Sequence, residues 1–308
     1  MIYYEGNKIN EIYYVANEVG GNSFRDIGYP ETPDCVQKGI DYAKSIYDSW
    51  TCIENGIVDF RNIKELVYLP LIDTSTYQSI KFTNCINLIY VPPIQVTSLV
   101  KHTNAMFYGC NNLKSVDLSN FDTSNVTKMN EMFTYCYNLT SLDLSSFNTS
   151  NVTTMNNMFG YCSGLTSLNL SSFDTSIVTD FQNMFGYCSN LINVDGYISF
   201  KSYSSSTMSY NYLFGYNQIA SLRKITFKDI GYHPNAIQFN VQYSLYWGAD
   251  TQNVPDARKS VIDSLITYSF DRASEGYSSC TISLSSKTMG LLTEDEIAQI
   301  TAKGFTIA

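Results

Sequence analysis

Histidine and basic residues are scarce in this sequence. The 308 residues include two histidines, His102 and His233, and 19 lysines and arginines against 28 aspartates and glutamates, for a formal net charge of -9. Neither histidine has a local partner motif, so both are interpreted as loop residues rather than catalytic bases. Because phosphate binding needs clustered Lys and Arg, the acidic balance argues against a nucleic-acid partner.

Long apolar segments are missing too. No run of 18 or more apolar residues occurs, so we expect no membrane insertion. The opening MIYYEGNKINEIYY lacks a basic region followed by an apolar one, so we do not expect it to be a secretory signal peptide. Folding in a cytoplasm is the resulting expectation. There the eight cysteines, which lack the C-x-x-C spacing of zinc sites, should be free thiols.

What the sequence has instead is an internal repeat. Three consecutive 26-residue units begin with MF-x-x-C at 106, 132 and 158, and a fourth begins at 184 before its sequence diverges. Looser copies extend the array upstream, from NIKELVYLP at 62–70, and downstream, to LFGYNQIASLRKITF at 213–227. Such repetition is typical of a solenoid, in which each unit buries its face against its neighbours. We expect about seven coils between residues 58 and 230.

Within one repeat the apolar spacing predicts a strand, a turn and a short helix. LTSLNLSSF at 165–173 has an L-x-x-L-x-L pattern whose last two leucines alternate as in a strand. TTMNNMFGYC at 153–162 carries apolar residues at i, i+3, i+4 and i+7, which is one face of a helix. The DTSNV segment between them is the turn. Outward strand positions should form a polar surface of small residues, namely Thr140, Ser141, Asp143 and Ser145.

The recurring cysteine is interpreted as part of the core. Cys110, Cys136, Cys162 and Cys188 end the predicted helical stripe, where cysteine acts as a small hydrophobic residue. A nucleophile needs one activated site rather than four equivalent copies. No G-x-S-x-G or phosphate-binding loop occurs either. We therefore expect no catalytic residues, no cofactor and no metal.

Calcium is an alternative at two stacked positions of the repeat. The candidates are Asp117, Asp143 and Asn169 at one position and Asp122, Asn148 and Asp174 at the other. We favour hydrogen bonds from these side chains to their own turns, as Asx residues often make. The Asn-Val-Thr triplets at 125 and 151 match a glycosylation acceptor. Thr127 and Thr153 are instead expected near the N-cap of the short helix.

The flanks suggest four parts: a docking hairpin over 1–30, a helical cap over 31–57, the repeats over 58–230 and an αβ capping domain over 231–308. TPDCVQKGIDYAKSIYDSW, from residue 32, carries one apolar helical stripe. In the C-terminal part we expect a helix near 256–269, a strand near 280–284 and a second helix with a Thr293–Glu296 capping box. Gly304 should follow that helix, and FTI is a candidate final strand.

The repeat MFxxCxxLxSLDLSxFDTSNVTxM resembles the BspA-like leucine-rich repeat over roughly residues 58–230. The ending LLTEDEIAQITAKGFTIA and the entry DYAKSIYDSW are similar to pieces that flank these repeats in structural proteins of tailed bacteriophages and prophages of gut bacteria. The IYYEGNKINEIYY hairpin resembles the virion-docking segments of such proteins. The resemblance implies a right-handed α/β solenoid of about seven coils of 22–29 residues, with an N-terminal hairpin and helix cap and a C-terminal αβ cap.

The resemblance also implies binding rather than catalysis. Bacterial members are surface adhesins that normally carry a secretion signal, so the start of this chain favours a virion fibre, tail or decoration protein assembled in host cytoplasm. Its partners would be other virion proteins, through the N-terminus, and a host surface protein or polysaccharide, with a homo-oligomer left open. A bacterial cell-surface adhesin is the alternative. A carbohydrate-active enzyme within residues 231–308 is a third.

Two sets of residues are candidate binding sites. Tyrosines recur beside the cysteine position, where an exposed ladder could stack on sugar rings, or where they could instead fill the convex side between helices. These are Tyr135, Tyr161, Tyr187 and Tyr216. The candidate virion-docking residues are Ile2, Tyr3, Tyr4, Ile9, Ile12, Tyr13 and Tyr14.

Overall fold

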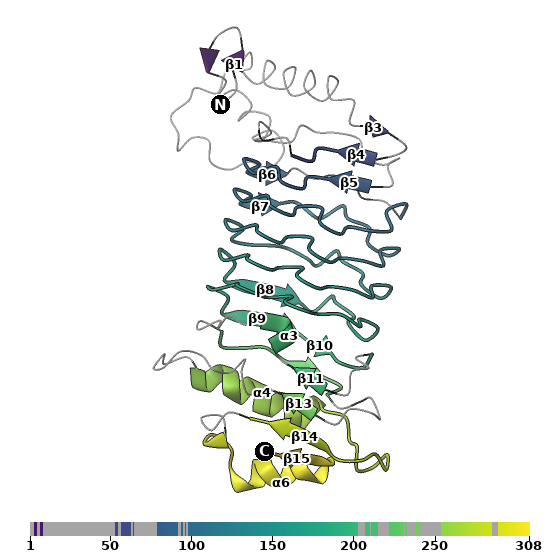
Figure 1. Ribbon diagram of the computed structural model, residues 1–308, viewed down its shortest axis with the longest axis vertical. Coiled ribbons are helices and arrows are strands. Elements are labelled where there is room, and N and C mark those ends of the chain that lie inside the picture. The colour runs from purple at the N-terminus through teal and green to yellow at the C-terminus, as the bar shows by residue number, and fades with distance from the viewer. Residues whose placement is uncertain are drawn as a thin grey trace.

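The computed structural model shows a tall stack of chain turns, with the C-terminal helices at the end opposite β4 and β5 (Figure 1). It describes residues 3–4, 7–8, 53–54, 57–62, 64, 79–91, 94, 96, 98–202, 207–209, 211–214, 222–230, 232, 238–240, 254–284 and 289–308. The predicted cap helix of residues 32–50 lies outside these ranges.

The strands are short. They are β1 (Tyr3–Tyr4), β2 (Asn7–Lys8), β3 (Ile53–Glu54), β4 (Ile57–Asp59), β5 (Ser79–Lys81), β6 (Tyr90–Val91), β7 (Ser115–Val116), β8 (Ser167–Leu170), β9 (Asn193–Gly196), β10 (Ile198–Ser199), β11 (Thr207–Ser209), β12 (Phe227–Lys228), β13 (Gln238–Asn240), β14 (Cys280–Ser283) and β15 (Phe305–Ile307). The helices are α3 (Asn211–Phe214), α4 (Val254–Tyr268) and α6 (Glu294–Ala302). In the described ranges, no helix has the length and apolar character that crossing a bilayer requires.

Parallel pairing places equivalent residues of successive repeats side by side. Strands β8 and β9 pair with Leu168 opposite Val194, one 26-residue period away. Isolated parallel bridges join Lys128 to His102 on one side and to Thr154 on the other. Only β1–β2 and β3–β4 pair antiparallel among the described strands. The β1–β2 pair lies where the sequence predicts the hairpin.

The MF-x-x-C segments are not helical, so this part of the prediction was wrong. The Met158 N–H donates to Met155 O within the same turn, at 3.2 Å, but the Phe159 N–H donates to Met184 O of the next repeat, at 2.9 Å. Asn157 and Tyr161 have φ of 54° and 62°, which a right-handed helix cannot accommodate. Successive tight turns therefore produce the apolar spacing that resembles a helical stripe.

The two threonines expected at a helix N-cap join neighbouring repeats instead. The Thr153 hydroxyl donates to Thr127 O at 3.2 Å, and the Thr127 hydroxyl donates to Lys101 O at 3.5 Å. The cap prediction was therefore wrong together with the helix.

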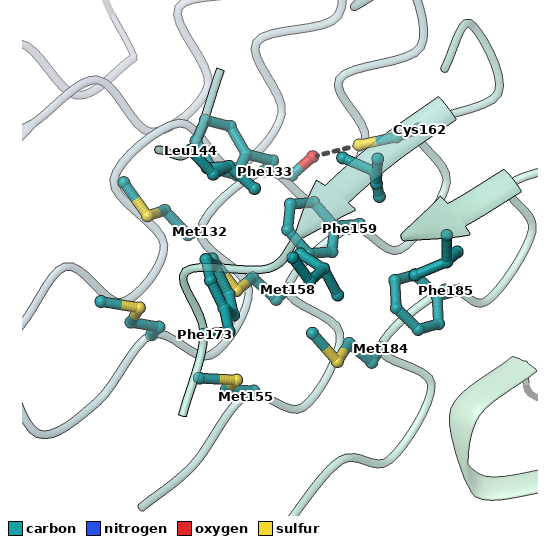
Figure 2. Close-up of a cluster of buried hydrophobic side chains, with 14 of the residues drawn as sticks. Met132, Phe133, Leu144, Met155, Met158, Phe159, Cys162, Phe173, Met184 and Phe185 are labelled. Carbon is teal, nitrogen blue, oxygen red and sulfur yellow. Dashed lines mark hydrogen bonds between the residues drawn. The ribbon is translucent and has the colours of Figure 1, made fainter. Parts of the chain in front are cut away.

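A column of phenylalanine rings runs through the core. Phe107, Phe133, Phe159 and Phe185 stack at centroid distances of 5.4, 6.0 and 5.9 Å, with their planes within 8° of parallel. All four are fully buried, and burying one such side chain stabilises the fold by about 1.5–3 kcal/mol. Figure 2 shows three rings of this column, those of Phe133, Phe159 and Phe185, beside the buried methionines of the same repeats. Each repeat thus covers its neighbour's apolar face.

The prediction that the recurring cysteines belong to the core is confirmed. Cys110, Cys136, Cys162 and Cys188 are fully buried. The Cys162 thiol also donates to Phe133 O of the preceding repeat, at 3.1 Å (Figure 2). That carbonyl accepts the Cys136 N–H at 3.1 Å as well, so both of its lone pairs have donors.

The C-terminal elements lie where the sequence predicts them. Helix α4, strand β14, helix α6 and strand β15 match the expected segments. Thr293 is the N-cap of α6 and forms both hydrogen bonds of the capping box with Glu296. Gly304, at φ 85°, follows the helix as expected. Strands β11, β13, β14 and β15 form a parallel sheet in that order.

Candidate functional site

The tyrosine column is built by the pairing between repeats. The Tyr135 N–H donates to Gly160 O at 2.9 Å, and the Tyr161 N–H donates to Gly186 O at 2.6 Å. This register places the rings of successive repeats against one another. The Tyr135 and Tyr161 centroids lie 4.5 Å apart with planes at 30°, and Tyr161 and Tyr187 lie 4.0 Å apart at 9°. Tyr216, the fourth candidate, lies outside the described residues.

Each of these tyrosines adopts a backbone conformation that suits glycine. Tyr135, Tyr161 and Tyr187 have φ of 64°, 62° and 63°, and the equivalent residue of the preceding repeat is Gly109, at 71°. A bulky residue with positive φ is an outlier that costs about 1–2 kcal/mol. Three consecutive repeats therefore retain a strained tyrosine where glycine would fit. Such strain often marks a functional position.

In the middle of the column, Tyr161 presents a ring edge rather than a ring face. Both faces of Tyr161 are covered, by Tyr135 and by Tyr187. A sugar ring stacking on Tyr161 would therefore have to displace a neighbour. Tyr187 is 44% exposed, so the column does reach solvent. Hydrogen bonding to Tyr187 raises the pKa of Tyr161 to about 12, so its phenol remains protonated at neutral pH.

Two further tyrosines widen this surface. Tyr108 packs edge-on against Tyr135 at 5.3 Å, and Tyr137 lies 5.9 Å from Tyr135 and is 40% exposed. Neither tyrosine was predicted from the sequence, because neither occupies the position just before the cysteine. Tyr108 and Tyr137 join this surface because their side chains reach Tyr135 from other positions of the repeat.

The surface formed by residues 140–145 is polar, as predicted, but these residues form no strand, because β7 ends at Val116 and β8 begins at Ser167. Thr140, Ser141, Asp143 and Ser145 are all exposed.

The Asx-turn interpretation is confirmed in full, because all six candidate side chains accept the N–H of the residue two positions later. These contacts are Asp117–Ser119, Asp143–Ser145, Asn169–Ser171, Asp122–Ser124, Asn148–Ser150 and Asp174–Ser176. The Ser145 N–H lowers the pKa of Asp143.

Neither a metal cluster nor a histidine-centred site emerges from the residues that are described. No group of three or more His, Cys, Asp or Glu side chains is placed to hold a metal ion there. His102 is exposed, and its Nδ1 lies 3.3 Å from the Thr127 hydroxyl. His233 lies outside the described ranges. Of the docking candidates only Tyr3 and Tyr4 lie inside them, in β1, while Ile2, Ile9, Ile12, Tyr13 and Tyr14 do not.

One family model covers the turns that carry the tyrosine column. Residues 95–218 match DUF285, described as a Mycoplasma protein of unknown function. This domain is associated with BspA-like repeat proteins. The match spans less than half of the 308-residue chain and coincides with its most regular repeats. No curated protein shows significant similarity to the chain.

Proposed function

We propose that the stacked turns form a right-handed BspA-like solenoid that acts as a non-enzymatic binding protein. The observation that carries this proposal is the strained, partly exposed tyrosine column retained in three successive repeats. The ring centroids recur along the stack at 4.5 and 4.0 Å, so the phenolic hydroxyls form a closely spaced row. A polysaccharide or another repetitive surface can engage several of them at once, and many weak contacts then add up to firm attachment.

The particle in which we place this protein is a bacteriophage virion. The support is the resemblance of the chain's two ends to phage structural proteins, with residues 1–30 as the segment that docks on other virion proteins. The repeats then face the host surface or neighbouring subunits as part of a fibre, tail or decoration protein. The DUF285 match over the repeats supports the repeat type and is equally compatible with a bacterial cell-surface adhesin, which is the second candidate.

Binding to host cells tests the role of the tyrosines. We expect the double variant Tyr161→Phe with Tyr187→Phe to reduce cell binding at least fivefold without unfolding, because phenylalanine keeps the stacked rings and removes only the hydroxyls. A Tyr277→Phe variant in the C-terminal part is the matched control. Unchanged binding by the double variant would remove the column from the site.

Removal of residues 1–30 tests the location. The truncated chain should remain folded but fail to co-sediment with phage particles that incorporate the full-length chain. If the truncated chain is incorporated equally well, the docking assignment is wrong. If the full-length chain is instead found on the surface of uninfected bacteria, the adhesin alternative is correct.

A further inference from the structure

A polar groove opens where the regular stack meets α4. It has a volume of about 510 Å³, and its walls include Asn169, Asp195, Tyr197, Thr226 and Tyr268. An adjoining hollow of about 370 Å³ shares Lys224, Thr226 and Tyr268 with it and adds Arg223 and Lys259. The two hollows therefore form one continuous site along the end of the strand surface.

The groove arises from a local departure from the repeat. Gly196 replaces the leucine that Leu170 supplies in the preceding repeat, and Tyr197 replaces the small Ser171. Gly196 has φ of 92°, and a Cβ there would lie 2.6 Å from the Leu170 carbonyl carbon. Only glycine allows this approach. The next side chain, that of Tyr197, then lines the groove and is 41% exposed.

Helix α4 forms the opposite wall and is fixed in place by serine hydroxyls. The Ser260 hydroxyl accepts the Ile225 N–H at 3.2 Å and donates to Ile225 O at 2.5 Å. The Ser264 hydroxyl accepts the Phe227 N–H at 3.1 Å. The helix thus satisfies backbone groups that another strand would otherwise pair, and it holds Tyr268 at the groove.

The two tyrosines supply a shared hydrogen-bonding centre. The hydroxyls of Tyr197 and Tyr268 lie 3.3 Å apart, and their rings meet edge to face at 5.0 Å. One phenolic proton is used between them, so the other remains available to a ligand. The contact raises the pKa of Tyr268, so the phenol of Tyr268 remains protonated at neutral pH.

The charged groups differ in how far they are already paired. Lys224 contacts Asp195 at 2.6 Å, and both side chains remain about half exposed. Lys259 pairs with Asp263 and Glu296. Arg223 is exposed and makes no ion pair or side-chain hydrogen bond within the described part of the chain. Lys228 adds a further positive charge above the Tyr197 ring, at 5.3 Å. The two hollows are thus lined by three basic side chains and two carboxylates, Asp195 and Asp263, and Arg223 is the basic side chain that these carboxylates leave unpaired.

We infer that this groove binds a carboxylated saccharide, such as a stretch of polyuronate. Arg223 is the group for the sugar carboxylate, because a guanidinium accepts a carboxylate in a bidentate, charge-assisted contact. The sugar hydroxyls, which both donate and accept hydrogen bonds, would face the polar side chains of the groove. These are Asn169, Asp195, Thr226 and the pair Tyr197 and Tyr268. This inference rests on the proposed binding function and names the chemical class that it recognises.

Calorimetric titration of the full-length chain tests the site. The probes are an oligogalacturonate and a neutral galacto-oligosaccharide of equal length. We expect the carboxylated probe to bind at least tenfold more tightly, with an affinity that falls as salt rises. Arg223→Gln and Tyr197→Ser, the latter restoring the residue of the preceding repeat, should each weaken it at least tenfold. Lys128→Gln, an exposed lysine on another surface, should change nothing.

The outcomes separate this inference from the proposed function. Equal binding of both probes, no binding of either, or an unaltered Arg223→Gln variant would each overturn the groove assignment. If cell binding still depends on Tyr161 and Tyr187 in that case, the proposed function stands without the groove. If the oligogalacturonate binds through Arg223 but the chain attaches to no host cell or particle, the groove stands and the proposed function fails.

Discussion

At the scale of single residues, each column tyrosine combines an unfavourable positive φ with favourable stacking of its ring. Tyr161→Ala removes the stacking contacts and leaves a Cβ at a φ of 62°, whereas Tyr161→Gly removes both the stacking and the strain. We expect the glycine variant to be more stable than the alanine variant by about 1 kcal/mol. Urea denaturation of the two variants measures this difference.

Ser145 provides the matched control, because it is exposed and does not have a positive φ. There the order should reverse, with Ser145→Gly less stable than Ser145→Ala by about 0.4–1 kcal/mol, because glycine gives the unfolded chain more conformational freedom. If glycine is the less stable variant at both positions, strain does not distinguish the tyrosine position.

The buried thiols predict a loss of stability at high pH. Burial raises the pKa of Cys188 to about 12 and holds those of Cys136 and Cys162 well above the ordinary value. The unfolded chain ionises these thiols first, near pH 9, so their contribution is complete below that pH and declines as pH rises toward 12. The free energy of unfolding should fall over this window by up to about 1.4 kcal/mol per pH unit for each thiol.

Cys188→Ala isolates one thiol. The variant should be less stable at pH 7, because it loses the sulfur and its 2.9 Å contact with Phe159 O, but its stability should fall less steeply above pH 9. Guanidinium titrations at several pH values measure both effects. Identical slopes for the variant and the parent would show that Cys188 ionises as easily in the folded state as in the unfolded one.

Residue spacing alone was enough to predict that the cysteines are buried, because apolar periodicity reports burial. The hydrogen bond from the thiol could not be predicted in this way. Its acceptor is a carbonyl 29 residues away in the preceding turn, for example Phe133 O for Cys162. Contacts of this kind depend on how the turns are aligned, which no local pattern specifies.

At the scale of elements, the capping box of α6 is a local device with a measurable effect. Thr293→Ala removes the acceptor for the Glu296 N–H and should cost about 1 kcal/mol of stability. Thr301→Ala is the control, because the Thr301 hydroxyl only donates back to Ile297 O within the same helix. Thermal unfolding compares them, and equal losses would show that the cap adds nothing specific.

Helix α6 and the MF-x-x-C segments show why some elements were predictable and others were not. The ends of α6 carry local signals, Thr293 with Glu296 at its start and Gly304 after its end. The MF-x-x-C segment has the apolar spacing of a helix, but every second N–H pairs with the next repeat. Hydrogen bonds to a neighbouring turn therefore prevailed over local periodicity, and the residues before Met158 and Cys162 took positive φ values.

At the scale of the whole molecule, the sequence predicted which residues line up but not where the stack changes. Tyr135, Tyr161 and Tyr187 follow from the 26-residue period, so these three members of the column could be named in advance, whereas Tyr108 and Tyr137 could not. The groove joins Asn169 and Asp195 to Tyr268 on α4, which lies far away in the sequence. The sequence signal for the groove was the replacement of the repeat's leucine and serine by Gly196 and Tyr197. That signal alone did not predict a groove, because the opposite wall is formed by α4.

The repeat period also makes the stack adjustable in length. Deleting residues 132–183, two full periods, joins Glu131 to Met184 and leaves equivalent residues in contact, since Glu131 and Asn183 share a positive φ. The deletion protein should fold cooperatively and be shorter by about 10 Å in small-angle scattering. Deleting residues 132–170, one and a half periods, misaligns every column and should abolish folding. Equal behaviour of the two deletions would contradict the proposed solenoid, because only a stack of interchangeable turns depends on whole periods.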